Sequence, residues 1–64
     1  MLRDSRDIIR RLLHEGYEEK GGKGSHVKFV HRQKRRMVVV PHPKRDLPIG
    51  TVHGIYRDAG WEKD

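Results

Sequence analysis

The chain contains no cysteine. Disulfide bonds and thiolate metal sites are therefore excluded, and a small secreted scaffold, which usually depends on disulfides, is disfavoured. Long hydrophobic runs are missing as well, since no apolar stretch approaches the roughly 18 residues that would predict a membrane-spanning helix. The first segment, MLRDSRDIIRRLL, carries charges throughout, so we predict no signal peptide and expect a cytoplasmic protein without a membrane partner.

Aromatic residues are few: two tyrosines, one phenylalanine and one tryptophan in 64 residues. A chain of this length is expected to form a single domain, residues 1–64, with a small hydrophobic core. Most of the aromatic side chains are needed for that core. A surface platform of aromatic rings on which nucleobases stack is therefore not predicted.

Acidic residues are absent from one long segment, residues 20–45. That segment holds nine of the fifteen basic residues, and the remaining six are outnumbered by nine acidic residues elsewhere. The net charge of +6 is thus concentrated in the middle of the chain. Such a local excess favours binding of a polyanion such as nucleic acid, whereas a merely solubilising surface intersperses both signs.

The N-terminal segment SRDIIRRLLHE, residues 5–15, has the apolar spacing of an amphipathic helix. Asp4 or Ser5 can cap its start by accepting a hydrogen bond from a backbone N–H of the first turn. Asp7 and Arg11 are four residues apart, so we expect them to pair on the exposed side.

The middle of the chain reads as three strands separated by polar turns. The segment 17–20 is a weak strand candidate, the glycine-rich segment 21–24 is expected to be a loop, and 25–32 alternates apolar and polar residues. Residues 32–35, RQKR, lack a tight-turn signal and predict a four-residue or bulged hairpin. The β-branched run RMVVVP, residues 36–41, is the clearest strand.

A second helix is predicted to begin at Pro48 and to end at Gly60. Its apolar residues recur at helical spacing: Val52, Ile55, Tyr56 and Ala59. Gly50 and Gly54 each cost such a helix about 1 kcal/mol relative to alanine. That cost suggests close backbone packing, or a phosphate near the start of the helix.

The element order predicts an α+β fold, in which a three-stranded antiparallel sheet carries both helices on one face. Alternation along the second strand then decides which side chains face the helices. Val27 and Phe29 point to the covered face, so His26 and Lys28 share the open face.

The five histidines do not form a predicted metal site. His26 and His31 are five residues apart on one strand, and this odd spacing sends them to opposite faces. His14 and His53 lie on separate helices, and no carboxylate between residues 20 and 45 can complete a ligand set. We predict surface or packing roles for His14, His31 and His53, whereas His42, between two prolines, is either an RNA contact or a surface residue.

A histidine among cations, without a metal, is suited to cleaving RNA through its own 2′-hydroxyl. His26 can accept the hydroxyl proton near neutral pH, and the adjacent Lys23 and Lys28 disfavour its charged form while stabilising the phosphate. Gly24 and Ser25 are expected to shape the loop, and Gly21 to Gly24 could offer backbone N–H groups to a phosphate. Lys28, His42 or water is the candidate general acid. On residue chemistry alone, however, a lone histidine at a strand edge is more often an ordinary surface residue.

Five further basic residues of the acid-free segment, from the turn after the second strand and the segment after the third, are expected to attract RNA by charge. The predicted RNA-binding residues, besides the loop and the flanking lysines, are Lys34, Arg35, Arg36, His42, Lys44 and Arg45.

Four segments together resemble the HicA toxin family in their order and spacing. They are SRDIIRRLLHEGYEE, KGSHVKFVH, VVVPHPKRDLPIGT and DAG, of which GSH and PHPKRDLPIGT are the most specific. The resemblance extends from Ser5 to about Gly60. It implies a fold like that of double-stranded-RNA-binding domains, in the order α-β-β-β-α. It also implies a toxin that cleaves single-stranded mRNA without the ribosome and is neutralised by a HicB-type antitoxin encoded beside it.

In that family the histidine of the GSH segment is catalytic, and it corresponds to His26 here; no metal or other cofactor is implied. Val27 and Lys28 stand where many relatives have a second histidine or a glutamine. The turn RQKRR is also more basic than usual. Two other readings use the same residues: a non-catalytic RNA-binding module of this fold, and a protein whose main role is to dock an acidic antitoxin.

Overall fold

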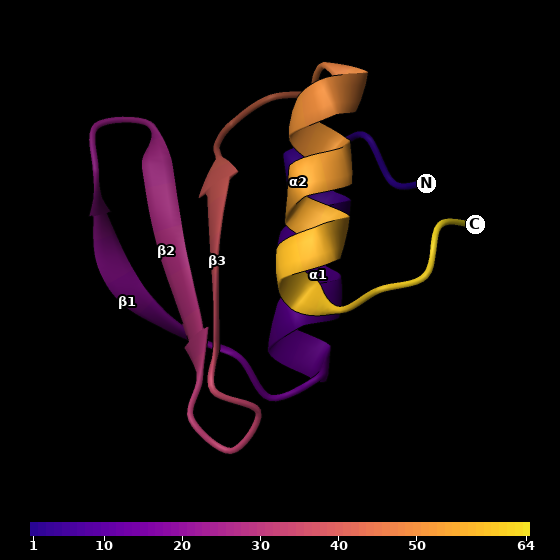
Figure 1. Cartoon of the computed structure of the whole chain (residues 1–64). Helices are drawn as coiled ribbons and strands as arrows, with labels where there is room; N and C mark the ends of the chain where they lie inside the picture. Colours follow the sequence, from indigo (N-terminus) through magenta and orange to yellow (C-terminus); the bar gives the residue numbers. More distant parts are fainter.

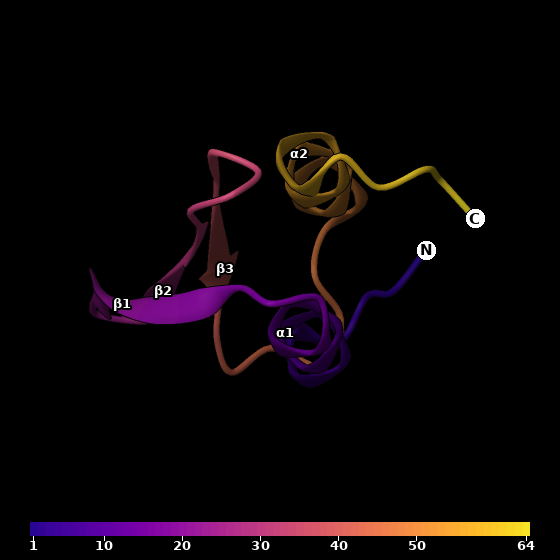
Figure 2. The same cartoon turned by 90° about the horizontal axis from the view of Figure 1, so that it is seen from below.

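The computed structural model describes every residue from Met1 to Asp64. The elements are α1 (Ser5–His14), β1 (Glu18–Lys23), β2 (His26–His31), β3 (Arg36–Pro41) and α2 (Ile49–Ala59). The strands form one antiparallel sheet in the order β1-β2-β3, and both helices lie on the same side, nearest to β3 and farthest from β1 (Figures 1 and 2). The predicted α+β fold class and the α-β-β-β-α order are confirmed.

Helix α1 begins at a side-chain cap. The carboxylate of Asp4 accepts the backbone N–H of Arg6 at 2.9 Å and also pairs with the Arg6 guanidinium at 2.9 Å. The side-chain hydrogen bond from Arg6, helped by its backbone N–H, lowers the pKa of Asp4 to about 2. Asp4 is therefore the N-cap, and Ser5 is the first, fully buried helical residue.

The prediction of an ion pair between Asp7 and Arg11 is wrong, because each of these residues has another partner. Asp7 pairs with Arg10 at 3.2 Å, and Arg11 pairs with Glu15 at 3.1 Å. The reason is Trp61, whose Nε1–H donates to Glu15 at 2.8 Å and whose ring centre lies 4.1 Å from the Arg11 guanidinium carbon. Arg11 therefore lies against the aromatic ring and closes the C-terminal segment onto α1.

Strand β1 differs most from the sequence prediction. We expected a strand over 17–20 and a loop over 21–24, but the strand covers Glu18–Lys23 and only Gly24 and Ser25 form the turn. Gly21 and Gly22 lie within this strand and have φ of 84° and 155°, values that residues other than glycine rarely adopt. The glycines thus form an irregular strand rather than a flexible loop.

The other two strands follow the predicted pattern. Pairs run from His26 opposite Pro41 to His31 opposite Arg36, joined by a four-residue turn over 32–35. Val38 is fully buried, whereas Met37 is 53% exposed, so β3 presents alternate residues to the helices and to solvent.

Helix α2 begins one residue later than predicted, because Pro48 is its N-cap residue. Gly60 ends it in the left-handed conformation with φ of 73°. The close packing suggested for the helical glycines is absent: a Cβ on Gly50 would meet nothing within 4 Å, and one on Gly54 only the end of Arg57. Neither helix is long and apolar enough to cross a membrane.

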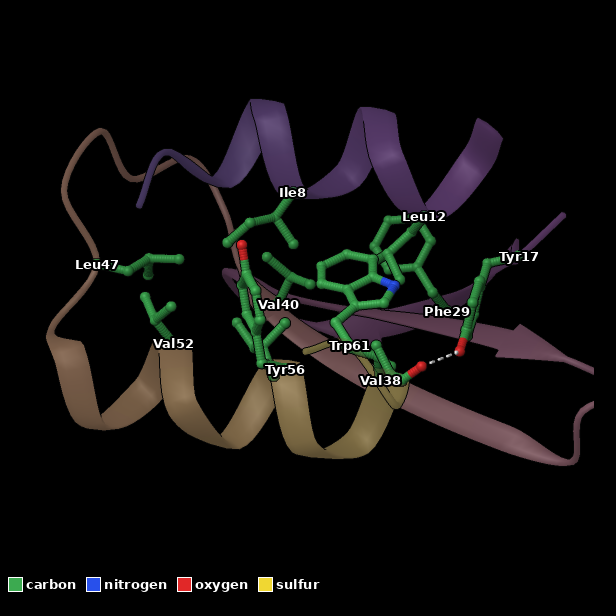
Figure 3. Packing of buried hydrophobic residues seen from close by; sticks show 12 residues of the cluster. Ile8, Leu12, Tyr17, Phe29, Val38, Val40, Leu47, Val52, Tyr56 and Trp61 are labelled. Carbon is green, nitrogen blue, oxygen red and sulfur yellow. Dashed lines mark hydrogen bonds between the residues drawn. The ribbon is translucent and has the colours of Figure 1, made fainter. Parts of the chain in front are cut away.

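The core lies between the helices and the covered face of the sheet (Figure 3). The apolar stripes of both helices meet Tyr17, Phe29 and alternate residues of β3 there. Its members are Ile8, Leu12, Tyr17, Phe29, Val38, Val40, Leu47, Val52, Ile55, Tyr56, Ala59 and Trp61. All side chains of β1 remain exposed, so this strand and the turn after it extend beyond the core.

Candidate functional site

The open face of the sheet carries His26. Along β2, Phe29 and His31 are buried under the helices, while His26 is exposed and Lys28 is half-buried on the opposite face. The predicted separation of His26 from His31 and its grouping with Lys28 follow from the two-residue period of a strand. The imidazole of His26 makes no hydrogen bond within the chain, so both of its nitrogens are free to meet a ligand.

A bulge in β1 brings further cations to this face. Glu19 pairs with Phe29, whereas Gly22 pairs with Val27, so β1 has one more residue than β2 between these pairs. The register then places Lys23 directly opposite His26. Cross-strand partners lie on the same face, and the Lys23 side chain therefore neighbours the imidazole.

The backbone of β1 passes very close to the backbone of β2 at Gly22. A Cβ at this position would collide with the carbonyl oxygen of His26 and would lie 2.9 Å from the Cα of Val27. Only a glycine lets β1 approach β2 so closely beside the exposed histidine.

These residues surround a shallow hollow of about 490 Å³ on the open face. It is lined by Lys20, Gly22, Lys23, His26, Lys28 and Val39. No acidic residue takes part, and the ion pairs of the chain involve other cations than the three lysines. Three unpaired ammonium groups beside an imidazole can hold an anionic group such as a phosphate.

The turn that leads into His26 is a two-residue hairpin. Gly24 has φ of 60° at the first turn position, where a tight turn of this kind needs glycine. The carbonyl of Ser25 accepts the backbone N–H of His42 at 2.6 Å. The expected glycine loop with several N–H groups directed at a phosphate is not formed, because Gly21 and Gly22 belong to β1.

The predicted cations of the β2–β3 turn lie at the other end of the sheet. Lys34 and Arg35 belong to that turn, and the five-residue step from His26 to His31 spans about 17 Å. Arg36 faces the helices, where its guanidinium donates to the carbonyl of Asp58 at 3.3 Å at the end of α2. These residues therefore do not line the hollow.

The predicted residues after β3 lie near the start of α1. The Nδ1 atom of His42 is 2.7 Å from the Oγ of Ser5, and the backbone of Lys44 bonds to Ser5 through both its N–H and its carbonyl. The side chains of Lys44 and Arg45 are exposed outside the hollow. Of the predicted site, the structure thus groups Lys23, His26 and Lys28 in one hollow, with the Gly24–Ser25 turn beside it.

His14, His31 and His53 lie outside the hollow. His31 is buried, donates through Nε2 to the carbonyl of Glu15 at 3.1 Å and accepts the backbone N–H of Lys34 at Nδ1. His14 and His53 are exposed on the helices. Nowhere do three histidine, aspartate or glutamate side chains converge in a way that could hold a metal ion.

The sequence matches a known protein family. The family model for the HicA toxin of bacterial toxin–antitoxin systems matches residues 5–61, most of the chain. The chain belongs to the HicA toxin family. Membership in this HicA family assigns the protein to toxin–antitoxin systems and implies an antitoxin partner. No curated protein matches the sequence closely enough to be taken as a relative.

Sequence reasoning missed two residues of the hollow of this HicA protein, Lys20 and Val39. Val39 could have been found, because alternation along RMVVVP exposes every second residue. Lys20 joins the hollow only because β1 continues through the bulge at Gly21. In the sequence, only the pair Gly21 and Gly22 marks this bulge, and the same pair is equally typical of a loop.

Proposed function

We propose that this HicA family member is the toxin of a toxin–antitoxin system and acts as a metal-independent endoribonuclease on single-stranded mRNA in the cytoplasm. The observation that carries the proposal is the exposed imidazole of His26 in a hollow lined by Lys20, Lys23 and Lys28 and free of acidic residues. The HicA family is known for ribonuclease activity, which supports the reaction class.

The proposed reaction uses the 2′-hydroxyl of the RNA as the nucleophile. Neutral His26 removes the hydroxyl proton, the 2′-oxygen bonds to the adjacent phosphorus, and the bond to the 5′-oxygen breaks. The products are a 2′,3′-cyclic phosphate and a 5′-hydroxyl, whose proton comes from Lys28 or from water. A general base of this kind contributes about 10²–10⁴-fold to the rate.

The lysines of the hollow stabilise the charge that develops on the phosphoryl oxygens. Lys23 lies opposite His26 in the ladder, and Lys28 follows it on the same face. Because catalysis requires stronger binding of the transition state than of the RNA, ammonium groups next to the reacting phosphorus are more effective than distant ones. Lys34, Arg35, Lys44 and Arg45 attract and orient the rest of the strand by charge.

The proposed partner is a HicB-type antitoxin encoded beside this protein. A net positive charge of +6, concentrated in residues 20–45, fits a partner with net negative charge that covers the cationic surface. Binding of such a partner would exclude RNA from the hollow.

A second candidate, a non-catalytic RNA-binding module, is favoured by one observation. The hollow contains a single imidazole and no second acid–base side chain apart from its lysines. In that case the same cations bind RNA and His26 is only a contact.

Cleavage of labelled RNA by His26→Ala separates the two candidates. We expect His26→Ala to lose at least about 10²-fold in cleavage rate while it still shifts RNA in a gel. The matched control is His53→Ala, which removes an exposed histidine from α2 and should cleave as fast as the parent. Cleavage should also survive EDTA, and the upstream product should end in a cyclic phosphate.

Two results would contradict the proposal. Equal cleavage by His26→Ala and the parent would remove the catalytic role of His26. A parent protein that shifts RNA but leaves its length unchanged would establish the binding module instead.

A further inference from the structure

The first residue of α1 carries a buried hydroxyl that bridges two segments. Ser5 has no exposed surface, and its Oγ accepts the backbone N–H of Lys44 at 2.9 Å. The same oxygen lies 2.7 Å from the Nδ1 of His42, and the backbone N–H of Ser5 donates to the Lys44 carbonyl at 2.8 Å. The segment after β3 is thus fastened to the start of α1 by three hydrogen bonds.

The donors and acceptors of this cluster fix the orientation of the His42 ring. Ser5 is fully buried, its Oγ accepts from Lys44, and Nδ1 of His42 is the sole acceptor within hydrogen-bond distance of its own hydrogen, so the hydroxyl donates to Nδ1. Nδ1 must then be unprotonated, and the neutral ring carries its hydrogen on Nε2. The ring therefore serves as a hydrogen-bond acceptor inside the fold.

The backbone of His42 continues the chain of contacts to the candidate catalytic residue. Its N–H donates to the carbonyl of Ser25 at 2.6 Å, one step beyond the ladder pair formed by His26 and Pro41. This bond joins the segment after β3 to the turn that leads into His26. No side chain of β1 is buried, so core packing does not hold the outer side of that turn.

We infer that His42 is a positioning residue: by accepting a hydrogen bond from Ser5, it holds the Ser25–His26 backbone in the geometry that cleavage requires. The inference rests on the proposed function of His26. A displacement of about 1 Å at a reacting group can cost about 10²-fold in rate, and a base at the end of a strand depends on such a support.

The test compares two substitutions of His42, one that keeps a hydrogen-bonding group in reach of Ser5 and one that has none. In His42→Asn the carboxamide oxygen can occupy the place of Nδ1 and accept from Ser5. His42→Leu has a similar size and no acceptor. We expect His42→Asn to keep single-turnover cleavage within about threefold of the parent, and His42→Leu to lose about 10–100-fold with RNA affinity nearly unchanged.

Ser5→Ala tests the same contact from the other side and should match His42→Leu in rate. Ile55→Val, a core substitution in α2 outside this cluster, is the control for a general loss of stability and should cleave like the parent. All variants are compared at a temperature at which thermal unfolding shows them to be fully folded. If Ser5→Ala does not fold, the two His42 variants still decide the question.

Hydrogen exchange of the His42 amide provides a readout that does not depend on activity. We expect its exchange to rise at least about tenfold in His42→Leu and to stay near the parent rate in His42→Asn and Ile55→Val.

The inference is overturned if His42→Leu and Ser5→Ala retain full cleavage rate and amide protection. It is also overturned if His42→Asn is as inactive as His42→Leu, because the ring itself would then contact the RNA. If the parent protein does not cleave RNA, the proposed function fails. The inferred support of the turn is then judged by amide exchange alone.

Discussion

His26 and His31 lie on the same strand, five residues apart, and have opposite environments. The ring of His31 has both nitrogens bonded and is packed edge-on against Tyr17, with ring centres 5.1 Å apart. The ring of His26 is exposed among lysines. At the residue scale, the face of the strand decides whether a histidine stabilises the fold or remains available for chemistry.

Gly22 is the residue whose replacement should most disturb the hollow directly. In Gly22→Ala the new methyl group would collide with the His26 carbonyl, so β1 must move away from β2. We expect a loss of about 1–3 kcal/mol in unfolding free energy and altered amide resonances at His26 and Val27.

Gly21→Ala is the matched control for Gly22→Ala. Its φ of 84° is also strained for alanine, but nothing lies within 4 Å of the new methyl group. Its cost should be limited to about 1–2 kcal/mol of backbone strain, with His26 unmoved. Equal effects of the two substitutions on the His26 resonances would contradict this account.

At the scale of elements, the two helices are joined at one end by a charged and aromatic contact. Glu15 at the end of α1 receives hydrogen bonds from Trp61 after α2 and from Arg11 of its own helix. Burial alone would raise the pKa of Glu15, but these hydrogen bonds outweigh it and lower the pKa below its ordinary value of 4.5.

This contact predicts a loss of stability in acid. Because the pKa of Glu15 is lower in the folded than in the unfolded chain, its stabilisation is complete above about pH 4.5 and disappears as the pH falls through the folded value. We expect Glu15→Gln to be less stable than the parent by about 1 kcal/mol at pH 7, with a difference that shrinks toward pH 3. Urea unfolding at several pH values measures this; a constant difference would contradict it.

Helix α2 contains a glycine that nothing in the fold requires. A Cβ on Gly50 meets open space, so Gly50→Ala should stabilise the helix by about 0.5–1 kcal/mol and raise the melting temperature by about 2–8 °C. Gly60→Ala is the contrasting variant, because Gly60 is left-handed and its Cβ would lie 2.7 Å from the Arg36 guanidinium carbon. It should lower the melting temperature, and a Gly50→Ala that does the same would contradict the prediction.

At the scale of the whole molecule, the lysine-lined hollow and the apolar core occupy opposite faces of the sheet. The helices and the covered face of the sheet supply the core (Figure 3), whereas the hollow and its lysines lie on the opposite face. The same three-stranded sheet therefore supports the core on one face and an anion-binding surface on the other.

This separation predicts that the salt dependence of RNA binding arises mainly from the lysines of the open face. Replacing Lys20, Lys23 and Lys28 together by glutamine should weaken RNA binding. The slope of the logarithm of the binding constant against the logarithm of the salt concentration should become less negative by about 2, because each lost phosphate contact contributes about 0.7. The control replaces three exposed cations outside the hollow, Arg10, Arg57 and Lys63, with the same change in net charge. Equal slopes for the two triple variants would mean that RNA responds only to net charge.

The sequence by itself determined the element order, both helical stripes and the face on which His26 lies. These follow from local periodicity, because alternation in a strand and the 3.6-residue repeat in a helix fix which side chains share a side. The assignment of Lys23 and Lys28 to the surroundings of His26 likewise needed only short spacing along the chain and the alternation of faces.

Only the tertiary structure decided the contacts that join distant segments. The bulge that brings Lys20 to the hollow depends on the pairing between β1 and β2. Arg11 pairs with Glu15 because Trp61 packs against both residues. The contact of His42 with Ser5 joins residues 37 apart. These contacts depend on how distant segments pack against one another, and the spacing of residues along the chain does not predict that packing.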